Sequence, residues 1–249
     1  MEQFEKLLEK HGSAILMFSS GKDSAACLEL LRPWLSRITL VWVDPGACHK
    51  LTLDYMEKVA KSVPNFHVIK GNQPETVAQF GWPADTLPVR STWAGSVGAG
   101  TRAVSFQPYT DCCARSMWNP LNNFLSGFQN PLVVTGQRRE ELLRNRFRDE
   151  EIQTIAGITY FQPINSWTSE QVWQYLKESG ADLPPFYDVG AESSADCWNC
   201  TAYLDHNLGR LKWMKKVEPA QYAEVEGVLK ELQLQLKEDS APLNELIGE

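Results

Sequence analysis

Four of the six cysteines stand in two places whose spacing suits metal chemistry. Cys112 and Cys113 are adjacent, and Cys197-Trp198-Asn199-Cys200 forms a Cys-x-x-Cys pair far downstream. Four thiolates can hold a structural zinc ion or an iron–sulfur cluster. Adjacent cysteine side chains point apart, which suits the separated iron atoms of a cubane better than one small ion. The pattern therefore favours a 4Fe–4S cluster, with zinc and unligated buried thiols as the alternatives.

A second group of residues suits anion binding. Between the apolar run at 14–18 and a helical pattern that begins at Ala25 lies a short polar loop, which consists of Ser19, Ser20, Gly21, Lys22, Asp23 and Ser24. A strand-to-helix junction presents free backbone N–H groups and the positive end of a helix dipole, and small residues let an anion approach closely. The order of residues is not that of the Walker loop or of a dinucleotide fingerprint. The alternative is a plain turn capped by Asp23 or Ser24.

The cysteines and the polar loop must be positioned by helices and strands, and the pattern of apolar residues predicts these elements. Apolar runs that indicate buried strands alternate with helical patterns, and they cover residues 14–18, 38–43, 66–69, 132–135 and 160–164. We expect an α/β fold, a Rossmann-like parallel sheet with helices on both faces and a helical C-terminal elaboration. The carboxyl ends of such strands gather ligands, which places the polar loop together with Asp44 at one edge. Asp44 either contacts a ribose or forms a turn.

The remaining helical patterns fill out the predicted architecture. Helices are predicted at 51–63, 114–126, 169–179 and 219–238. The proline- and glycine-rich stretch from Gln73 to Asp111 shows no clear pattern, and it is interpreted as an active-site cover or as connecting structure. We expect one nucleotide-binding domain over residues 1–205, which would include the cysteine site, and a helical extension over residues 206–249 packed on that domain.

Charge and composition limit the kinds of partner that the protein is expected to bind. The formal net charge is −7, which argues against an extensive nucleic-acid surface. An island of arginines suits a small anion, and it comprises Arg138, Arg139, Arg144, Arg146 and Arg148. Arg138 and Arg139 are the candidates for bidentate contacts to a sulfate or phosphate, against the alternative of solvated helix arginines; Arg144 and Arg146 are weaker candidates. No long apolar run or signal peptide is present, so no membrane contact and a cytoplasmic location are expected.

The loop and the cysteines together resemble a known family. The loop resembles the Ser-Gly-Gly-x-Asp-Ser loop of the adenine-nucleotide alpha hydrolase (PP-loop) superfamily, with Ser20 in place of the first glycine. Over roughly residues 12–205 the chain is similar to sulfonucleotide reductases, which act on adenosine 5′-phosphosulfate (APS) or 3′-phosphoadenosine 5′-phosphosulfate (PAPS). Ser20 should fit the loop in place of that glycine if its backbone dihedrals are ordinary. The family's basic pair after Cys-Cys is replaced by Ser116 and Met117.

The resemblance implies an adenine nucleotide (APS, PAPS or ATP), a 4Fe–4S cluster, and reduction of activated sulfate to sulfite with a thioredoxin-type reductant. The family's nucleophile is a cysteine on a C-terminal tail, and the sequence has no cysteine after Cys200. Three readings stay open. In the first, the protein is a reductase in which Cys48 or an external thiol replaces the tail cysteine. In the second, it cleaves ATP with Mg²⁺ and adenylates an acceptor for sulfur transfer, together with a sulfur donor or acceptor protein. In the third, it is a non-catalytic nucleotide-binding module.

Overall fold

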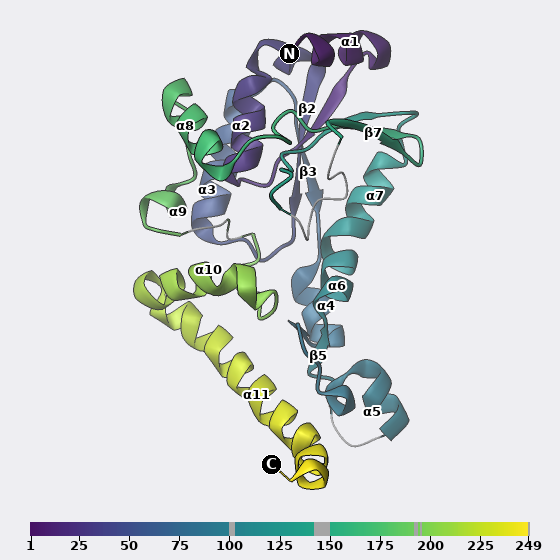
Figure 1. Ribbon diagram of the computed structural model, residues 1–249, viewed down its shortest axis with the longest axis vertical. Helices are drawn as coiled ribbons and strands as arrows, with labels where there is room; N and C mark the ends of the chain where they lie inside the picture. Colours follow the sequence, from purple (N-terminus) through teal and green to yellow (C-terminus); the bar gives the residue numbers. More distant parts are fainter. Residues whose placement is uncertain (100–102, 142–149, 192–193, 195, 249) are drawn as a thin grey trace. The chain divides into compact units, whose positions relative to one another are not determined.

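The computed structural model describes residues 1–99, 103–141, 150–191, 194 and 196–248 (Figure 1). The chain forms two compact units. Unit 1 comprises Met1–Asp44, Lys50–Ile69 and Leu121–Asp188, and unit 2 comprises Pro45–His49, Lys70–Pro120 and Val189–Glu249. Each unit therefore brings together segments that are distant in the sequence. The expected division at residue 205 stays a prediction about domains.

Unit 1 is built on a six-stranded sheet of order β3-β2-β1-β6-β8-β7 (Figure 1). The strands are β1 (Ala14–Met17), β2 (Ile38–Asp44), β3 (Phe66–Lys70), β6 (Leu132–Val134), β7 (Ile152–Ile155) and β8 (Ile158–Phe161). β1 pairs in parallel with β2 and with β6, and β6 pairs in parallel with β8. The expected α/β class with a mostly parallel sheet flanked by helices is confirmed.

The apolar runs form these strands because both faces of the sheet are covered. On one face Ile15, Val41 and Val133 pack into a common core. The strands align in register, with Ala14 opposite both Ile38 and Leu132. Because β1 has β2 on one side and β6 on the other, the loops that follow β1 and β6 lie at the switch point of the sheet, where ligands bind in open α/β folds.

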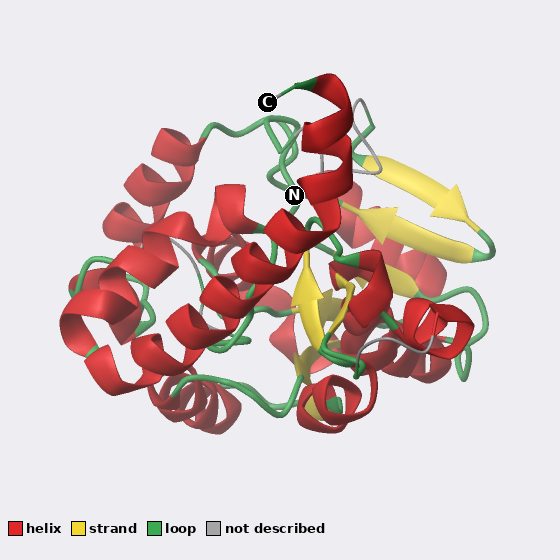
Figure 2. Ribbon diagram, turned by 90° about the horizontal axis from the view of Figure 1, so that it is seen from below, coloured by secondary structure: helices red, strands yellow, loops and turns green. Residues whose placement is uncertain are grey.

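The strand β7 was not expected from the sequence. It pairs antiparallel with β8 at the edge of the sheet, and Figure 2 shows the two as long arrows joined by a tight loop. That loop is Ala156-Gly157, with φ of 49° and 81°. Positive φ at both positions is typical of the type I′ turn that joins two strands with the correct twist. The half-exposed residues of β7 gave no continuous apolar run.

The helices of unit 1 are α1 (Glu2–His11), α2 (Lys22–Leu30), the 3₁₀ turn η1 (Arg32–Arg37), α3 (Lys50–Ser62), α8 (Ser169–Ser179) and α9 (Pro185–Asp188). The bounds of α8 agree with the prediction, since Thr168 and Gln171 form a capping box. α8 packs against α2, the helix that follows the polar loop.

Unit 2 contains the stretch that was predicted to lack regular structure, and that prediction is wrong for its described residues. It forms α4 (Gln73–Phe80), β4 (Trp82–Ala84), η2 (Val89–Ser91), α5 (Trp93–Ala99) and β5 (Phe106–Pro108). The prolines stand where elements begin or pair in a two-stranded sheet, with Pro74 in the first turn of α4 and Pro83 in β4. Proline fits these positions without breaking the element.

The predicted helix at 114–126 is divided into α6 (Tyr109–Cys113), a π-helical turn (Ala114–Trp118) and α7 (Asn119–Leu125), which spans the point where the chain passes from unit 2 to unit 1. Two helices complete unit 2. α10 (Leu204–Val217) was not predicted, and α11 (Pro219–Ile247) extends beyond the predicted end at residue 238. None of the helices in the described ranges is long and apolar enough to span a membrane.

Candidate nucleotide and thiol sites

The polar loop closes on itself through Ser24. The Ser24 hydroxyl donates to the carbonyl of Gly21 at 2.9 Å and accepts from the backbone N–H of Ser19 at 3.3 Å. Gly21 is the N-cap of α2 and makes no side-chain cap hydrogen bond. Of the two residues considered for capping a plain turn, Asp23 and Ser24, it is Ser24 that makes these contacts, from inside the first turn of the helix.

Ser20 departs from the expectation of ordinary backbone dihedrals. Its φ is +58°, and the residue is fully buried. This is the left-handed region, which costs a non-glycine residue about 1–3 kcal/mol and which glycine adopts freely. The surrounding structure therefore imposes a glycine-like conformation on a serine.

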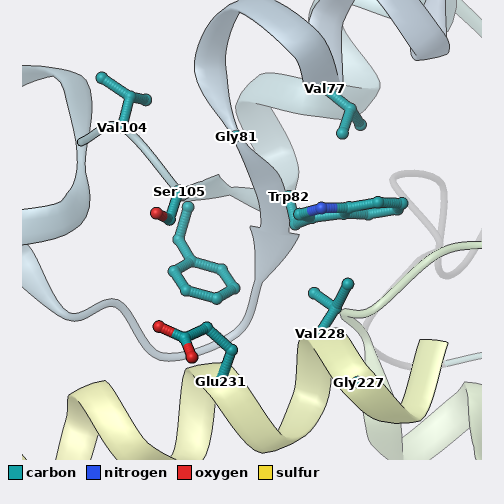
Figure 3. Close-up of a pocket in the computed structure, with 9 residues that line it drawn as sticks. Val77, Gly81, Trp82, Val104, Ser105, Gly227, Val228 and Glu231 are labelled. Carbon is teal, nitrogen blue, oxygen red and sulfur yellow. The ribbon is translucent and has the colours of Figure 1, made fainter. Parts of the chain in front are cut away.

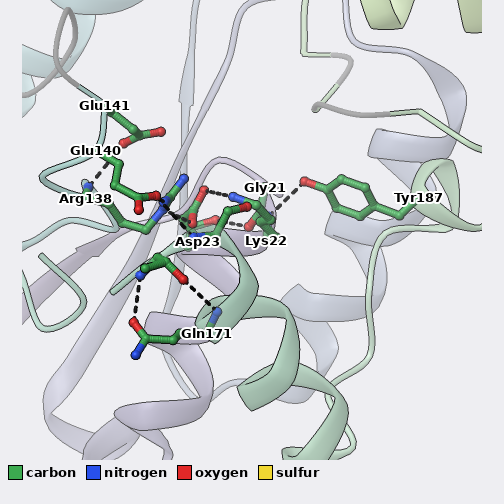
Figure 4. A network of polar contacts seen from close by, with 11 residues as sticks. Gly21, Lys22, Asp23, Arg138, Glu140, Glu141, Gln171 and Tyr187 are labelled. Atoms are coloured by element: carbon green, nitrogen blue, oxygen red, sulfur yellow. Dashed lines mark hydrogen bonds and ion pairs between the residues drawn. The ribbon is translucent and has the colours of Figure 1, made fainter. Parts of the chain in front are cut away.

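A network of charged side chains lies beside the polar loop of residues 19–24 (Figure 4). Asp23 lies between two cations, with its Oδ1 at 2.8 Å from Nε of Arg138 and its Oδ2 at 2.7 Å from Nζ of Lys22. The Nη1 of Arg138 contacts Oε2 of Glu140 at 2.8 Å. Burial of the Arg138 guanidinium disfavours its charge, but the carboxylates of Asp23 and Glu141 outweigh burial and raise the pKa of Arg138. Arg138 is thus a buried, paired cation, not a solvated helix arginine.

The other predicted anion ligands differ in their surroundings. The backbone N–H of Lys22 donates to the hydroxyl of Tyr187 at 2.9 Å, so this loop donor already has a partner. Arg139 is exposed, and its backbone N–H donates to the carbonyl of Asn165. Asp44 is buried at the end of β2. Arg144, Arg146 and Arg148 lie outside the described residues.

Gly136, which follows β6, makes the closest backbone approach to the loop. A Cβ on Gly136 would meet the carbonyl carbon of Asp23 at 2.8 Å and the backbone nitrogen of Ser24 at 2.9 Å. No flexible side chain is available to move aside, because both contacts are backbone atoms. Position 136, the second residue after β6, thus has to be glycine for the two loops to meet.

Gly136→Ala is expected to lower the free energy of unfolding by about 1–3 kcal/mol, since overpacking at fixed backbone has this cost. Urea unfolding followed by circular dichroism measures it. Gly98→Ala is the control, because a Cβ on Gly98 in α5 would meet nothing within 4 Å. Gly98→Ala should not lower the urea midpoint, since alanine is favoured over glycine in a helix. If Gly136→Ala also unfolds at or above the native midpoint, the close contact at Gly136 is contradicted.

All four predicted metal-binding cysteines belong to unit 2. Burial, followed by the charges of Cys200 and Cys112, raises the pKa of Cys113 to about 12. Burial also raises the pKa of Cys197, with further contributions from Cys200, Asp196, Cys113 and Cys112. Each pair therefore lies close enough for one thiolate charge to affect the other. These four residues are called the cysteine quartet below.

The donor chemistry of the quartet fits an iron–sulfur cluster, which takes four thiolates. Within the residues that the structure describes, however, no group of three or more His, Cys, Asp or Glu side chains is arranged to hold a metal ion. The structure brings the four thiols near one another without forming a ligand cage. The cluster remains a prediction.

Arg210 is the feature of this region that the sequence analysis missed. It lies on α10, is 1% exposed, and donates from Nη1 to the carbonyls of Cys197 at 2.5 Å and Trp198 at 2.6 Å and from Nη2 to the carbonyl of Cys200 at 2.9 Å. Burial lowers its pKa, whereas the charges of nearby thiols raise it. The guanidinium therefore fixes the backbone of the Cys-x-x-Cys turn.

A second basic residue was also overlooked. Arg115 stands one residue before the lost basic pair, in the π-helical turn after Cys113. Its guanidinium donates to Gln107 at 2.8 Å, lies 4.1 Å from the centroid of the Phe80 ring, and acts to lower the pKa of Cys112 against the larger effect of burial. A positive charge thus persists near the quartet despite Ser116 and Met117.

Cys48, the candidate nucleophile, belongs to a segment that is hydrogen-bonded to the Cys-x-x-Cys turn. The backbone N–H of Trp198 donates to the carbonyl of Ala47 at 3.0 Å. Gln73 joins the same assembly, because its N–H donates to the carbonyl of Pro45 and its side chain donates to Asn199 at 3.1 Å. Cys48 is half-buried, whereas Cys27 is fully buried.

His49, beside Cys48, is buried in unit 2. Its ring lies 5.3 Å from that of Trp213, and Nε2 is 3.7 Å from Oε1 of Glu218. Burial lowers the pKa of His49 more than Glu218 raises it. At pH values at which His49 of the unfolded chain is protonated, the folded protein therefore favours the neutral imidazole.

The free energy of unfolding is expected to fall as the pH drops below about 6.5, the ordinary histidine pKa, because the unfolded chain then binds a proton that folded His49 excludes. The slope is at most about 1.4 kcal/mol per pH unit. Urea unfolding between pH 7.5 and 5.5 tests this, and His49→Gln should flatten the profile. His67→Gln is the control, since His67 is exposed. Equal slopes in native protein and His49→Gln would refute the prediction.

The fold and the first site define a class. A serine-rich loop between β1 and the N-terminus of α2, at the switch point of a parallel sheet, is the nucleotide-binding arrangement of the PP-loop proteins. The chain belongs to the phosphoadenosine phosphosulfate reductase domain family, whose model matches residues 13–203.

Relatives support this membership. An adenosine 5′-phosphosulfate reductase of Neisseria meningitidis serogroup B is 23% identical over 220 residues, which cover 85% of this chain and 82% of that protein. An uncharacterized protein of Methanocaldococcus jannaschii is 24% identical over 84% of this chain, and an adenosine 5′-phosphosulfate reductase of Burkholderia cepacia is 34% identical over 41% of it. The matches span 46% and 42% of those two relatives, less than half of each.

A solved structure shares the fold. The phosphoadenylyl-sulfate (PAPS) reductase of Candida auris, in a phosphate complex, superposes with a TM-score of 0.50 at 16% identity and covers 72% of this chain and 79% of that one. At this identity the similarity establishes the fold alone.

Proposed function

We propose that the protein binds an adenine sulfonucleotide through unit 1 and reduces its activated sulfate to sulfite. The names of the Neisseria and Candida relatives support this substrate class. In unit 1 the N-terminus of α2 and the loop supply anion-binding donors, and Arg138 with Lys22 supplies positive charge. Both cations contact Asp23, so an incoming sulfate or phosphate would exchange with that carboxylate as their partner.

The thiol step uses Cys48. Its thiolate would attack the sulfate sulfur, and the bond from that sulfur to the bridging oxygen would break, so that the nucleoside phosphate leaves with the electron pair. A thiosulfonate then forms on Cys48. A thioredoxin-type dithiol would attack Sγ of Cys48 and release sulfite, and its second thiol would resolve the mixed disulfide. The sulfate sulfur is reduced by two electrons to sulfite, and the two thiols of the thioredoxin-type protein are oxidised to a disulfide.

One observation carries the assignment to Cys48. Outside the quartet the sequence offers only Cys27 and Cys48. Cys27 is fully buried in α2, and burial raises its pKa far above the ordinary value. Cys48 is partly exposed and follows Ala47, whose carbonyl accepts from Trp198 in the middle of the Cys-x-x-Cys turn. Of these two thiols, Cys48 is therefore the more accessible for nucleophilic chemistry.

The test incubates the anaerobically purified full chain with APS, PAPS or ATP and Mg²⁺, in the presence of reduced thioredoxin. We expect sulfite from APS or PAPS, loss of sulfite in Cys48→Ser, and retention in Cys27→Ala. Mass spectrometry should detect an 80 Da adduct, the mass of an SO₃ group, on Cys48 when the thiol reductant is omitted. Pyrophosphate release from ATP without sulfite would replace the proposal by the adenylating alternative, and nucleotide binding without either product would favour a non-catalytic module.

We also propose that the quartet holds a 4Fe–4S cluster. When bound, the cluster would join residues 112–113 to residues 197–200 through iron–thiolate bonds and tune the redox and electrostatic properties of unit 2. Arg210 would orient the turn, and Arg115 would add positive charge. Iron and sulfide analysis together with visible absorption tests this, with Cys197→Ser expected to lose iron and Cys27→Ala to keep it. A colourless protein with stoichiometric zinc would overturn the cluster.

A further inference from the structure

Unit 2 contains a cavity that none of the chemistry above uses. Its volume is about 370 Å³, and it lies between the end of α4, the β4–β5 pair and α11 (Figure 3). The residues that line it are Val77, Gly81, Trp82, Val104, Ser105, Phe106, Gly227, Val228 and Glu231. A volume of this size is within the range of small-molecule pockets.

The walls are apolar and aromatic. Trp82 and Phe106 are register partners on β4 and β5, and Val228 packs against the same cluster from α11. Figure 3 shows Val228 and Glu231 directed from α11 toward the strands, with Val77 approaching from α4. Such walls accept an organic body. The half-buried Trp82 ring offers a face that attracts a positive charge, whereas Phe106 is 1% exposed and belongs to the packed core of the wall.

Glu231 is the one charged residue among those that line the cavity. Its Oε1 accepts from Nε2 of Gln235 at 2.6 Å, which holds the carboxylate in place. For Oε2 the described residues provide no hydrogen-bond donor. Glu231 is itself exposed, so its carboxylate stands at the solvent side of the cavity, where it favours a cation over a neutral or anionic ligand in a protein whose net charge is −7.

Gly227 lies at the exposed border of the cavity. It stands inside α11, where glycine is the least favourable residue after proline, and a Cβ there would meet nothing within 4 Å. Packing does not require a glycine at this position. A larger side chain would therefore be tolerated by the helix while it occupies space that borders the cavity.

We propose that this cavity binds a small organic ammonium ion with an aromatic or aliphatic body, at a site separate from the nucleotide loop. The ammonium group would pair with Glu231, and the body would lie against Trp82 and Val228. The site requires neither the cysteine quartet nor Cys48, so it can be tested independently of the proposed reduction.

The probe is phenethylammonium, with 2-phenylethanol and phenylacetate as its neutral and anionic counterparts. Calorimetric titration of the full chain measures binding. Glu231→Gln removes the charge and keeps an oxygen that can accept from Gln235. Gly227→Leu fills the space, and Glu224→Gln is the matched charge control, since Glu224 lies on the same helix, is exposed and does not line the cavity.

We expect phenethylammonium to bind at least fivefold more tightly than 2-phenylethanol, and phenylacetate not to bind. Binding should weaken at least fivefold in Glu231→Gln, disappear in Gly227→Leu with a melting temperature no lower than that of the native protein, and persist in Glu224→Gln. No binding of the cation, equal binding of the cation and the alcohol, or undiminished binding in both Glu231→Gln and Gly227→Leu would overturn the proposal. If Gly227→Leu fails to fold, the comparison of Glu231→Gln with Glu224→Gln decides.

Discussion

Arg210→Met is expected to lower the free energy of unfolding by about 3 kcal/mol or more. Methionine keeps much of the packing volume but removes the donors for the carbonyls of Cys197, Trp198 and Cys200. A buried polar group left without a partner costs about 1–3 kcal/mol, and three carbonyls lose theirs at once. Urea unfolding gives the change.

The matched control is Arg37→Met. Arg37 also donates to backbone carbonyls, those of Leu8 and Gly12, but it is exposed, so water can replace it. A loss of about 1 kcal/mol or less is expected there. A second readout follows the thiols: in Arg210→Met, Cys197 and Cys200 should react faster with a thiol reagent. Similar losses for the two arginine variants, with unchanged thiol reactivity, would contradict the role of Arg210.

Arg138→Met is expected to cost about 2–4 kcal/mol, because it removes a buried cation, leaves Glu140 without this partner and leaves Asp23 with Lys22 alone. Arg139→Met should stay within about 0.5 kcal/mol, since Arg139 is exposed. The neighbouring arginines looked equivalent in the sequence, so urea unfolding of the two variants separates their roles.

A double-mutant cycle strengthens this test. If the contact between Arg138 and Asp23 carries the effect, then Asp23→Leu combined with Arg138→Met should cost less than the sum of the single losses by about 1–3 kcal/mol. Additive losses would place the cause elsewhere in the structure. Lys22 remains in all four proteins, and its pairing with Asp23 limits the coupling that can be measured.

Much of the fold was accessible from the sequence because it rests on local signals. The continuous apolar runs predicted β1 and β2, and the helical apolar pattern over residues 169–179 predicted α8 with its bounds. Prolines caused the largest error, because Pro74 and Pro83 were interpreted as breaks where the structure has a helix start and a strand. A proline can either interrupt a helix or strand or stand at its beginning, and only its position within the element distinguishes the two cases.

The sites were predicted by residue type, but not by their contacts. Asp23 and Arg138 are far apart in the chain, so no spacing indicates that they form an ion pair. The positive φ of Ser20 and the burial of Arg210 likewise depend on packing by distant segments. Local pattern therefore finds the candidate groups, whereas tertiary structure decides which of them are exposed and which are already paired.

The contact between Gly136 and the backbone of Asp23 and Ser24 has a consequence for protein engineering. A designer who transplants residues 19–24 into another parallel sheet would carry over the donors but not the bare backbone that supports them from the adjoining strand. The transplant should succeed only in a host that has glycine just after the neighbouring strand. The smallest transferable piece is thus a pair of loops from β1 and β6, not the single loop that the sequence makes conspicuous.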